Sequence, residues 1–366
     1  QRYYGQKEDN CRMKILLLSK YGRLGASSRL RSYQYIPYLE KQGILVDNAP
    51  LLGDEYLRKL YSAGNRPLMS IAKSYLQRLW NILRFKHYDL LWIEKELFPW
   101  MPAIAESCLR KFGVKYVVDY DDAIFHQYDL HPNPLVRMML QKKIDKVMRH
   151  ATLVIVGNDY LAKRASQAGA RWVEILPTVI DIERYTLSGI RQNNGFCIGW
   201  IGTPTTAKYI YQIKDALVRI CLEKNAKLLL IGLEKIDIEG VPVQTFPWAE
   251  KKEVELIKMF DVGIMPLQDG AWEKGKCGYK LIQYMACSLP VVASPVGANE
   301  EIVDHGVNGY LASTETEWLE SFRRLQQDKR LRTEMGKAGR AKVEKKYCLQ
   351  VTAPRFVELL EKVAAK

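Results

Sequence analysis

Residues 261–297 read DVGIMPLQDGAWEKGKCGYKLIQYMACSLPVVASPVG and contain a strand, a loop, a helix and a second strand in that order. The runs Val262–Pro266 and Val291–Ser294 are almost wholly apolar, which is typical of strands buried on both faces of a parallel sheet. Between them, apolar side chains recur at helical spacing at Leu281, Ile282, Met285 and Ala286. This order predicts a βαβ unit and therefore a doubly wound α/β fold.

The same alternation extends in both directions from this segment. In the second half, further strands are expected at Phe196–Gly202, Lys227–Gly232 and Tyr310–Ala312. In the first half, the corresponding runs are Lys14–Ser19, Leu90–Ile93, Tyr116–Asp119, Leu153–Gly157 and Val173–Pro177. Helical periodicity separates them at Ser28–Gln42, Leu68–Arg84 and Val136–Arg149.

A polar stretch, Thr186–Asn194, separates the two series of strands and predicts a linker. We therefore expect an extension over residues 1–12, a Rossmann-like domain over 13–189, a second one over 190–345, and a helix over 346–366 that packs back on the first domain. Two such domains in tandem would face each other across a deep cleft. Ligands would bind there at the carboxyl ends of the strands.

Composition and charge restrict the class of protein. The 366 residues are 48% hydrophobic and 26% charged, as in ordinary globular proteins. Most of the net charge of +14 lies before residue 190, which favours anionic partners. Seven scattered cysteines favour a reducing, cytoplasmic setting, and the five histidines show no zinc-finger spacing. No apolar run reaches the ~20 residues of a membrane-spanning helix, and residues 1–12 have no signal-peptide core.

Two loops of the first half carry candidate ligand-binding residues. In Tyr21–Arg31, Gly25 permits a tight turn, Ser27 and Ser28 are expected to cap a helix, and Arg29 and Arg31 would attract a phosphate. The second loop follows the strand at Tyr116–Asp119. Its acidic residues could bind a metal, accept sugar hydroxyls or act as a base, and we favour hydroxyl binding. They are Asp119, Asp121 and Asp122, with Glu94 and Glu96 in the same position after the preceding strand.

Two loops of the second half suit an anion. The strand ending at Gly202 leads into Thr203 and a helix whose first turns contain Lys208. Farther on, Gly275 and Gly278 precede the helix of the opening segment, and basic side chains flank them at Lys274, Lys276 and Lys280. Open backbone N–H groups beside three cations are suited to a diphosphate. Cys277 is a poor candidate nucleophile because no histidine lies nearby in the sequence.

At these residues the sequence resembles glycosyltransferase family 4, the retaining GT-B enzymes that use nucleotide-diphosphate sugars. The resemblance runs from about Met13 to the C-terminus and is strongest at GKCGYKLIQYMACSLPVVASPVGANEEIVDHGVNGYL. There the family has an E-x7-E block, then MA-x-G-x-PVV and G-x-x-E-I-V, and Glu301 fits the last glutamate. In this chain, Gly275 and Gln283 replace the two glutamates of E-x7-E, and Thr203 replaces an arginine.

The resemblance implies a role for individual residues. Catalytic roles fall to Asp122, Lys208 and Lys280. Contacts with the donor's nucleotide and diphosphate fall to Gly202, Thr203, Lys276, Gly278, Gln283 and Glu301. Contacts with the donor sugar or the acceptor fall to Gly25, Arg29, Glu273 and Glu96.

The resemblance also implies the ligands and the setting. The first domain would bind the acceptor, a saccharide or lipid-linked saccharide, and the second would bind a UDP- or GDP-linked sugar without a metal. The expected activity is a retaining, metal-independent hexosyl transfer in the synthesis of bacterial surface polysaccharide or lipopolysaccharide. The enzyme would be cytoplasmic, with peripheral contact to an anionic membrane as a further expectation.

Other interpretations remain open. Without the two glutamates, the chain could instead be a GT-B-like sugar-nucleotide epimerase or a non-catalytic nucleotide-sugar binder. A nucleic-acid-binding protein is a remote alternative, because the cations form no recognised reader motif. For the helices Leu68–Arg84 and Leu135–Arg149, we favour packing on the sheet with charged outer faces over docking to a membrane.

Overall fold

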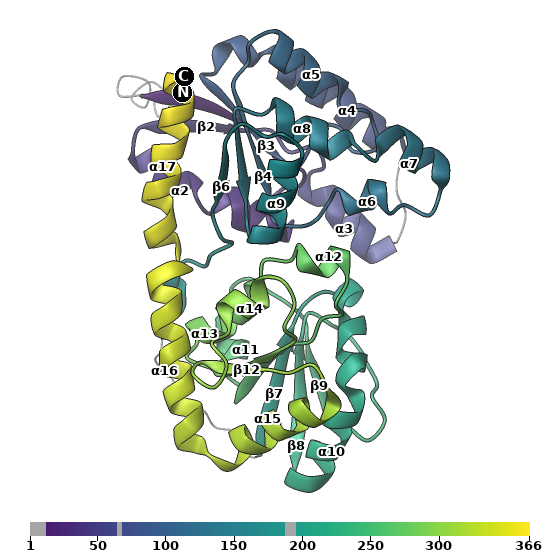
Figure 1. Ribbon diagram of the computed structural model, residues 1–366, viewed down its shortest axis with the longest axis vertical. Helices are drawn as coiled ribbons and strands as arrows, with labels where there is room; N and C mark the ends of the chain where they lie inside the picture. The colour runs from purple at the N-terminus through teal and green to yellow at the C-terminus, as the bar shows by residue number, and fades with distance from the viewer. Residues whose placement is uncertain (1–11, 64–67, 187–194) are drawn as a thin grey trace. The chain divides into compact units, whose positions relative to one another are not determined.

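The computed structural model describes residues 12–63, 68–186 and 195–366 (Figure 1). The chain forms two compact units: the part up to Thr178 together with Thr352–Lys366, and Val179–Val351. The sequence places the boundary after Gly189, but Ile180 and Tyr185 belong to the buried core of the second unit. Most of the expected linker and of the expected extension over 1–12 lies outside the described residues.

The first unit is built on a parallel six-stranded sheet with the order β2-β1-β3-β4-β5-β6. Its strands are β1 (Met13–Leu18), β2 (Ile44–Asn48), β3 (Leu90–Glu94), β4 (Tyr116–Tyr120), β5 (Leu153–Val156) and β6 (Val173–Ile175). The α-helices before residue 178 are α1 (Ala26–Ser28), α2 (Ile36–Lys41), α3 (Asp54–Ala63), α4 (Leu68–Leu83), α5 (Ile104–Lys111), α6 (His126–Asp129), α7 (Pro134–Leu140), α8 (Lys143–His150) and α9 (Asp159–Gln167). A π-helix, η1 (Arg29–Tyr33), and a 3₁₀ helix, η2 (Phe85–His87), complete this part.

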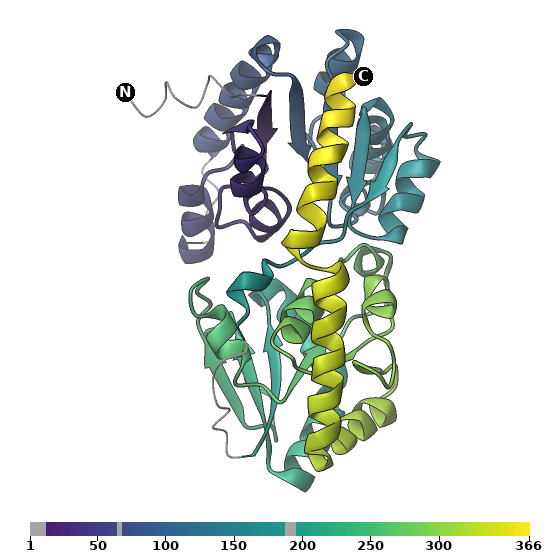
Figure 2. The same ribbon diagram turned by 90° about the vertical axis from the view of Figure 1, so that its left-hand side faces the viewer.

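A helix from the far end of the chain completes the core of the first unit. Most of α17 (Leu349–Ala365) belongs to this unit, and Figure 2 shows it in yellow against the first sheet. The ring of Phe356 lies 4.8 Å from that of Trp92 on β3 and 5.0 Å from that of Tyr35. Phe356 and Trp92 are both buried, so the helix supplies part of the hydrophobic core.

The second unit repeats the architecture with the strand order β12-β11-β10-β7-β8-β9. Its strands are β7 (Phe196–Ile201), β8 (Ala226–Ile231), β9 (Val243–Phe246), β10 (Val262–Met265), β11 (Val291–Ala293) and β12 (Gly309–Leu311). Its α-helices are α10 (Lys214–Lys224), α11 (Glu253–Ile257), α12 (Ala271–Lys274), α13 (Tyr279–Ala286), α14 (Ala298–Ile302), α15 (Glu315–Gln327) and α16 (Lys329–Lys346). Two 3₁₀ helices, η3 (Ile182–Arg184) and η4 (Pro204–Ile213), complete it.

The ten strands expected from apolar runs are all present, and the doubly wound α/β fold is confirmed. Two strands were not predicted, β2 and β9. Each lies at the edge of its sheet and is only partly buried, so neither has a continuous apolar run.

The helix expected over Ser28–Gln42 is broken into α1, η1 and α2, with Pro37 in the first turn of α2. The expected caps are also wrong: the residue before α1 is Gly25. Ser28 instead donates to Glu94 on β3 at 2.6 Å, so its hydroxyl links the first helix to the sheet.

Candidate functional site

The glycine- and lysine-rich loop of the second unit lies between α12 and α13, beyond the carboxyl end of β10. Gly278 directly precedes α13 and has a φ of 64°, a left-handed conformation that favours glycine. A side chain there would also collide with Ile302. The loop therefore favours glycine at this position, and it turns the chain so that α13 begins beside the lysines. First-turn N–H groups of a helix attract anions.

Lys280, in the first turn of α13, has an unusual electrostatic environment. Its Nζ lies 4.2 Å from the centre of the Trp200 ring on β7. The same Nζ lies close to Gly202: a Cβ added at Gly202 would be 2.8 Å from it. Burial, and secondarily the charge of Lys276, lower the pKa of Lys280 from 10.5 to about 7. Among the residues that the structure describes, no carboxylate forms an ion pair with it, so an anion bound here would relieve the cost of charging it.

The loop after β7 contributes Gly202, Thr203 and Lys208. The segment after Thr203 is the 3₁₀ helix η4 rather than the expected α-helix. Its first turn is held by a hydrogen bond from the Thr203 N–H to the Thr206 hydroxyl at 3.2 Å. Lys208 is exposed, with its Nζ 5.1 Å from the centre of the Tyr209 ring. The structure thus brings Gly202 close to Lys280, whereas Lys208 lies over the ring of Tyr209.

Three other predicted donor-site residues of this unit have partners of their own. Glu273 is buried and accepts a hydrogen bond from the Tyr209 hydroxyl. Gln283 is buried, and its amide donates to the Tyr185 hydroxyl at 3.3 Å. Glu301 is exposed and accepts from the Tyr347 hydroxyl at 3.1 Å. Their roles toward a sugar or nucleotide stay predictions.

In the first unit, the aspartates after β4 differ in their exposure. Asp119 forms a buried, bidentate ion pair with Arg31: its two carboxylate oxygens accept from Nε at 2.9 Å and from Nη2 at 2.5 Å. Arg31 is therefore not available for a phosphate, contrary to the expectation, because the buried carboxylate already occupies its guanidinium. The Asp122 side chain is 30% exposed, against 4% for Asp119 and 12% for Asp121. Asp122 is thus the most accessible of the three.

Lys95, which sequence reasoning missed, organises these aspartates. Its Nζ lies 2.8 Å from Asp121 Oδ1 and 3.9 Å from Asp122 Oδ2, and it donates to the Ser27 hydroxyl at 3.2 Å. Burial alone would lower the pKa of Lys95, but the charges of Asp121, Asp122 and Glu94 raise it above its ordinary value. Its φ of 64° is strained for a non-glycine residue and aims the side chain across the ends of the strands. A lysine directly after the apolar strand LLWIE was the available signal.

The remaining predicted acceptor residues are enclosed. Glu96 is buried and forms an ion pair with Lys143. Arg29 is buried and donates to the Arg23 carbonyl at 3.2 Å. Gly25 packs against Tyr21, where a Cβ would lie 2.5 Å from the tyrosine Cβ. Neither the Arg29 side chain nor the Glu96 side chain is open to solvent. Their contact with a donor sugar or an acceptor therefore stays a prediction.

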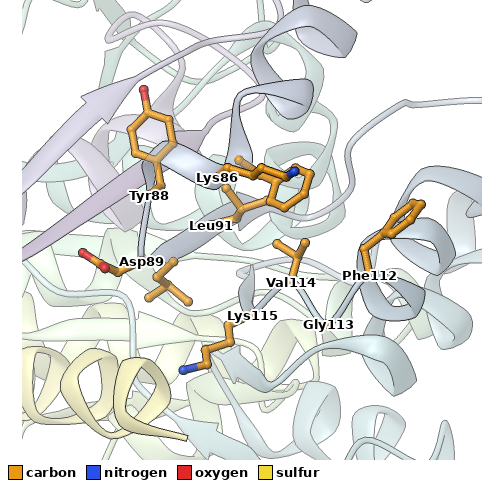
Figure 3. Close-up of a pocket in the computed structure, with 10 residues that line it drawn as sticks. Lys86, Tyr88, Asp89, Leu91, Phe112, Gly113, Val114 and Lys115 are labelled. Atoms are coloured by element: carbon orange, nitrogen blue, oxygen red, sulfur yellow. The ribbon is translucent and has the colours of Figure 1, made fainter.

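A cavity of about 220 Å³ lies elsewhere in the first unit (Figure 3). Its lining includes Leu90 and Leu91 at the start of β3 and Lys115 directly before β4. The amino ends of parallel strands lie at the sheet edge opposite the carboxyl ends, so this cavity is separate from the aspartates. Within the described residues, no group of three or more metal-ligating side chains comes together.

Comparison with known proteins supports the assignment of the second unit. Residues 195–328 match the family model described as Glycosyl transferases group 1. N-acetyl-alpha-D-glucosaminyl L-malate synthase of Bacillus anthracis is 27% identical over 153 residues, which cover 38% of this chain and 38% of that protein. The probable sucrose-phosphate synthase of Thermosipho melanesiensis is 34% identical over 86 residues, 23% of this chain and 19% of its own. The chain thus spans well under half the length of these curated relatives.

Solved structures show the same fold over nearly the whole chain. HepE of Anabaena, in complex with UDP-glucose, has a TM-score of 0.71 at 19% identity, with 96% of this chain and 100% of that chain covered. WaaG, a glycosyltransferase involved in lipopolysaccharide biosynthesis, has a TM-score of 0.68 at 14% identity, with 95% and 99% covered. The fold is therefore that of the GT-B glycosyltransferases. Residues 195–328 thus match a glycosyltransferase domain, and the chain as a whole has the fold of these enzymes.

Proposed function

We propose that the protein transfers a sugar from a nucleotide-diphosphate donor to a saccharide or lipid-linked saccharide, as a retaining enzyme of glycosyltransferase family 4. The observation that carries this proposal is the placement of Lys280 beside Lys276, Gly202 and the start of α13. A half-buried lysine whose neighbouring charge is another lysine suits a ligand with two or more negative charges. The diphosphate of a nucleotide sugar is such a ligand.

The reaction needs the leaving diphosphate to be stabilised. In the proposed step, the bond between the anomeric carbon and the phosphate oxygen breaks, and a bond from that carbon to the acceptor oxygen forms on the same face. The proton of the acceptor hydroxyl passes to the leaving phosphate. Negative charge grows on the diphosphate as the bond breaks, so Lys280, Lys276 and the N–H groups of α13 bind the transition state more tightly than the ground state.

The first unit would hold the acceptor through Asp122. Its carboxylate is partly exposed, and Lys95 fixes the loop that carries it. A fixed carboxylate can accept hydrogen bonds from sugar hydroxyls, which orients the reacting oxygen. We also propose that the protein transfers a hexose without a metal. The product would belong to a bacterial surface polysaccharide or lipopolysaccharide, and the transfer would take place on the cytoplasmic side.

Thermal unfolding with UDP, GDP, dTDP, ADP and CMP, each with magnesium and with EDTA, tests the donor site. A ligand at 100 times its dissociation constant stabilises the native state by about 2.7 kcal/mol, which is a readable shift. We expect one diphosphate, UDP or GDP, to raise the melting temperature equally with magnesium and with EDTA. No shift with any nucleotide would contradict the proposed site.

Turnover distinguishes the transferase from the alternative functions. In an assay with the identified donor and a glycan or lipid extract as the source of acceptor, Lys280→Ala should lower turnover by orders of magnitude. The control Lys337→Ala, on the exposed face of α16, should keep the turnover of the wild type. If the protein binds the donor tightly but neither transfers its sugar nor hydrolyses it, a non-catalytic binder would be favoured. Conversion of the donor into an isomeric sugar nucleotide would favour the epimerase.

A further inference from the structure

The outer face of α4 carries an apolar stripe, so the expectation of a charged outer face on this helix is wrong. The exposed side chains of the stripe are Leu76, Leu79, Trp80 and Leu83. A concentration of positive charge in the first unit lies instead at the amino ends of three adjacent strands. Lys115, Thr152 and Trp172 directly precede β4, β5 and β6. Because these strands are parallel, the three positions meet at one edge of the sheet, opposite to the edge of the aspartates.

A cavity of about 420 Å³ lies at this edge. It adjoins the smaller cavity of Figure 3, since Gly113, Val114 and Lys115 line both. Backbone hydrogen bonds join the segments around it. The N–H of Thr152 donates to the Tyr116 carbonyl at 2.9 Å, and the N–H of Val154 donates to the Trp172 carbonyl at 2.9 Å. The larger cavity is therefore built on the sheet rather than on a single loop.

The lining of the larger cavity contains five basic side chains and no aspartate or glutamate. We call it the basic cavity, after Arg110, Lys115, His150, Arg171 and Lys366. Within the part of the chain that the structure describes, no carboxylate forms an ion pair with any of the five. Glu174, two residues after Trp172, is already engaged: it accepts from the Trp172 indole at 2.8 Å and pairs with Arg355 at 2.6 Å.

Backbone carbonyls occupy only part of the donor capacity of these cations. Lys115 donates to the Ala364 carbonyl on α17 at 2.6 Å, and Arg110 donates to the Arg149 carbonyl on α8 at 3.2 Å. An ammonium group has three N–H donors and a guanidinium has five, so both side chains keep donors for a ligand. Over residues 12–63, 68–186 and 195–366, the Arg171 guanidinium has no hydrogen-bond partner.

His150 reports the electrostatic potential in the basic cavity. Its Nδ1 lies 3.3 Å from the Ser107 hydroxyl. Burial lowers the pKa of His150, and the charges of Arg110, Arg149 and Lys146 lower it further. These cations disfavour another positive charge, so the potential at the imidazole is positive. A bound anion would favour the protonated imidazole and raise the pKa of His150.

We propose that the basic cavity is a second anion site, separate from the diphosphate site of the second unit, and that it binds a small molecule with a phosphate group. The planar guanidinium groups of Arg110 and Arg171 can match phosphate oxygens with paired hydrogen bonds. A cluster of cations also favours the two charges of a phosphate over the single charge of a carboxylate. The volume lies within the range of small-molecule sites, whereas a nucleic acid would need cations along an extended surface.

The place of the basic cavity in the sheet indicates how such a ligand would act. Asp122 follows the carboxyl end of β4, whereas Lys115 precedes its amino end. The ligand would therefore not compete with an acceptor bound at Asp122, and it would act as an effector. This proposal does not rest on the proposed function.

Nuclear magnetic resonance of the histidine ring protons tests the proposal, with inorganic pyrophosphate as the probe. The full chain is titrated with pH in pyrophosphate and in sodium chloride of the same ionic strength, and the signal of His150 is assigned by its loss in His150→Gln. We expect pyrophosphate, but not chloride, to raise the pKa of His150. His126, which follows β4 at the opposite edge of the sheet, serves as the internal control and should titrate alike in both salts.

Variants separate the basic cavity from the proposed donor site and from a general effect of charge. All are made in Lys280→Met, which lacks the central cation of the donor site, and calorimetry measures their affinity for pyrophosphate. Arg110→Gln/Arg171→Gln should bind pyrophosphate at least about tenfold more weakly than Lys280→Met alone. The control Lys163→Gln/Arg324→Gln removes the same charge from exposed positions of α9 and α15 and should keep the affinity.

The two experiments give clear outcomes. A rise in the pKa of His150 that persists in Lys280→Met would support the basic cavity, whether or not a nucleotide binds to the second unit. An unchanged pKa of His150, a rise that disappears in Lys280→Met, or an equal loss of affinity in the two double variants would overturn the proposal. Both double variants change only exposed residues, so without pyrophosphate their melting temperatures should equal that of Lys280→Met.

Discussion

Lys280 should take up a proton when the protein binds a nucleoside diphosphate. With a pKa of about 7, the side chain is about nine-tenths neutral at pH 8 before a ligand arrives. The negative charges of a bound diphosphate favour the protonated form and raise that pKa. We therefore expect Lys280 to take up close to one proton per bound ligand at pH 8 and to contribute only about a tenth of a proton at pH 6.

The assay is isothermal titration calorimetry of UDP, or of whichever diphosphate shifts the melt, in buffers of different ionisation enthalpy. The phosphate of the ligand titrates near pH 6 and is fully ionised at pH 8, so uptake at pH 8 comes from the protein. The affinity should fall about tenfold per pH unit above 7. In Lys280→Met, which keeps the length of the side chain, the uptake should vanish, whereas Lys337→Met should retain it.

The same substitution has a consequence for stability. Because the pKa of Lys280 is depressed on folding, the folded state binds fewer protons, and the free energy of unfolding rises as the pH goes from 7 to 10.5. One pKa unit corresponds to about 1.4 kcal/mol, so the cost of charging Lys280 below pH 7 is a few kcal/mol after allowance for its partial exposure. Lys280→Met should thus be more stable than the wild type at pH 6. Unchanged proton uptake in that variant, or a loss of stability at pH 6, would refute this account of the site.

Further outcomes follow from the conformations and ion pairs of both units. Gly278→Ala should lower both the melting temperature and the affinity for the diphosphate, because the new side chain collides with Ile302 in addition to straining the left-handed backbone. In the control Gly306→Ala, the backbone is also left-handed but the space is open, so the melting temperature should fall by less. Asp119→Asn should destabilise the protein by about 3–5 kcal/mol in denaturant titration, since it leaves a buried arginine without its carboxylate. Asp122→Asn should keep the melting temperature and lower turnover by at least about a hundredfold, and normal turnover would exclude it from the acceptor site. Burial raises the pKa of Glu94 above 4.5. The stability that protonated Glu94 contributes is therefore complete below pH 4.5 and is lost as the pH rises. In Glu94→Gln, the free energy of unfolding should decline less steeply above pH 4.5 than in the wild type.

The sequence predicted the parts of the fold in which burial is complete. The central strands β1, β3, β4 and β7 are mostly apolar because both of their faces are covered, and their charged residues are Lys14, Glu94 and Asp119. The edge strand β2 was not predicted for the same reason: it is only partly covered, and its three apolar residues are followed by the exposed polar residues Asp47 and Asn48. Such an edge strand is defined by backbone hydrogen bonds to its neighbour rather than by burial. Backbone hydrogen bonds do not depend on the side chains, so the residue types do not predict them.

The candidate site was predictable where it depends on the backbone and the local charge. Gly278 and Lys280 lie within three residues of each other, so a short motif contains both. The pairing of Arg31 with Asp119 joins residues that are 88 positions apart, and it changes an expected phosphate ligand into a buried structural ion pair. The position of Lys95 after LLWIE is visible in the sequence, but its role depends on a left-handed backbone conformation and on the aspartates that follow the neighbouring strand. Interactions of this kind depend on which strand ends become neighbours.

The packing of α17 on the first sheet affects the order in which the chain can fold during synthesis. Phe356 leaves the ribosome only after the whole of Val179–Val351, and until then Trp92 has no ring from α17 to cover it. The second unit, by contrast, is continuous in the chain and can close its own core first. A nascent first unit therefore waits with an uncovered apolar face, and ribosome stalling or truncation before residue 352 should release chains that chaperones capture through that unit.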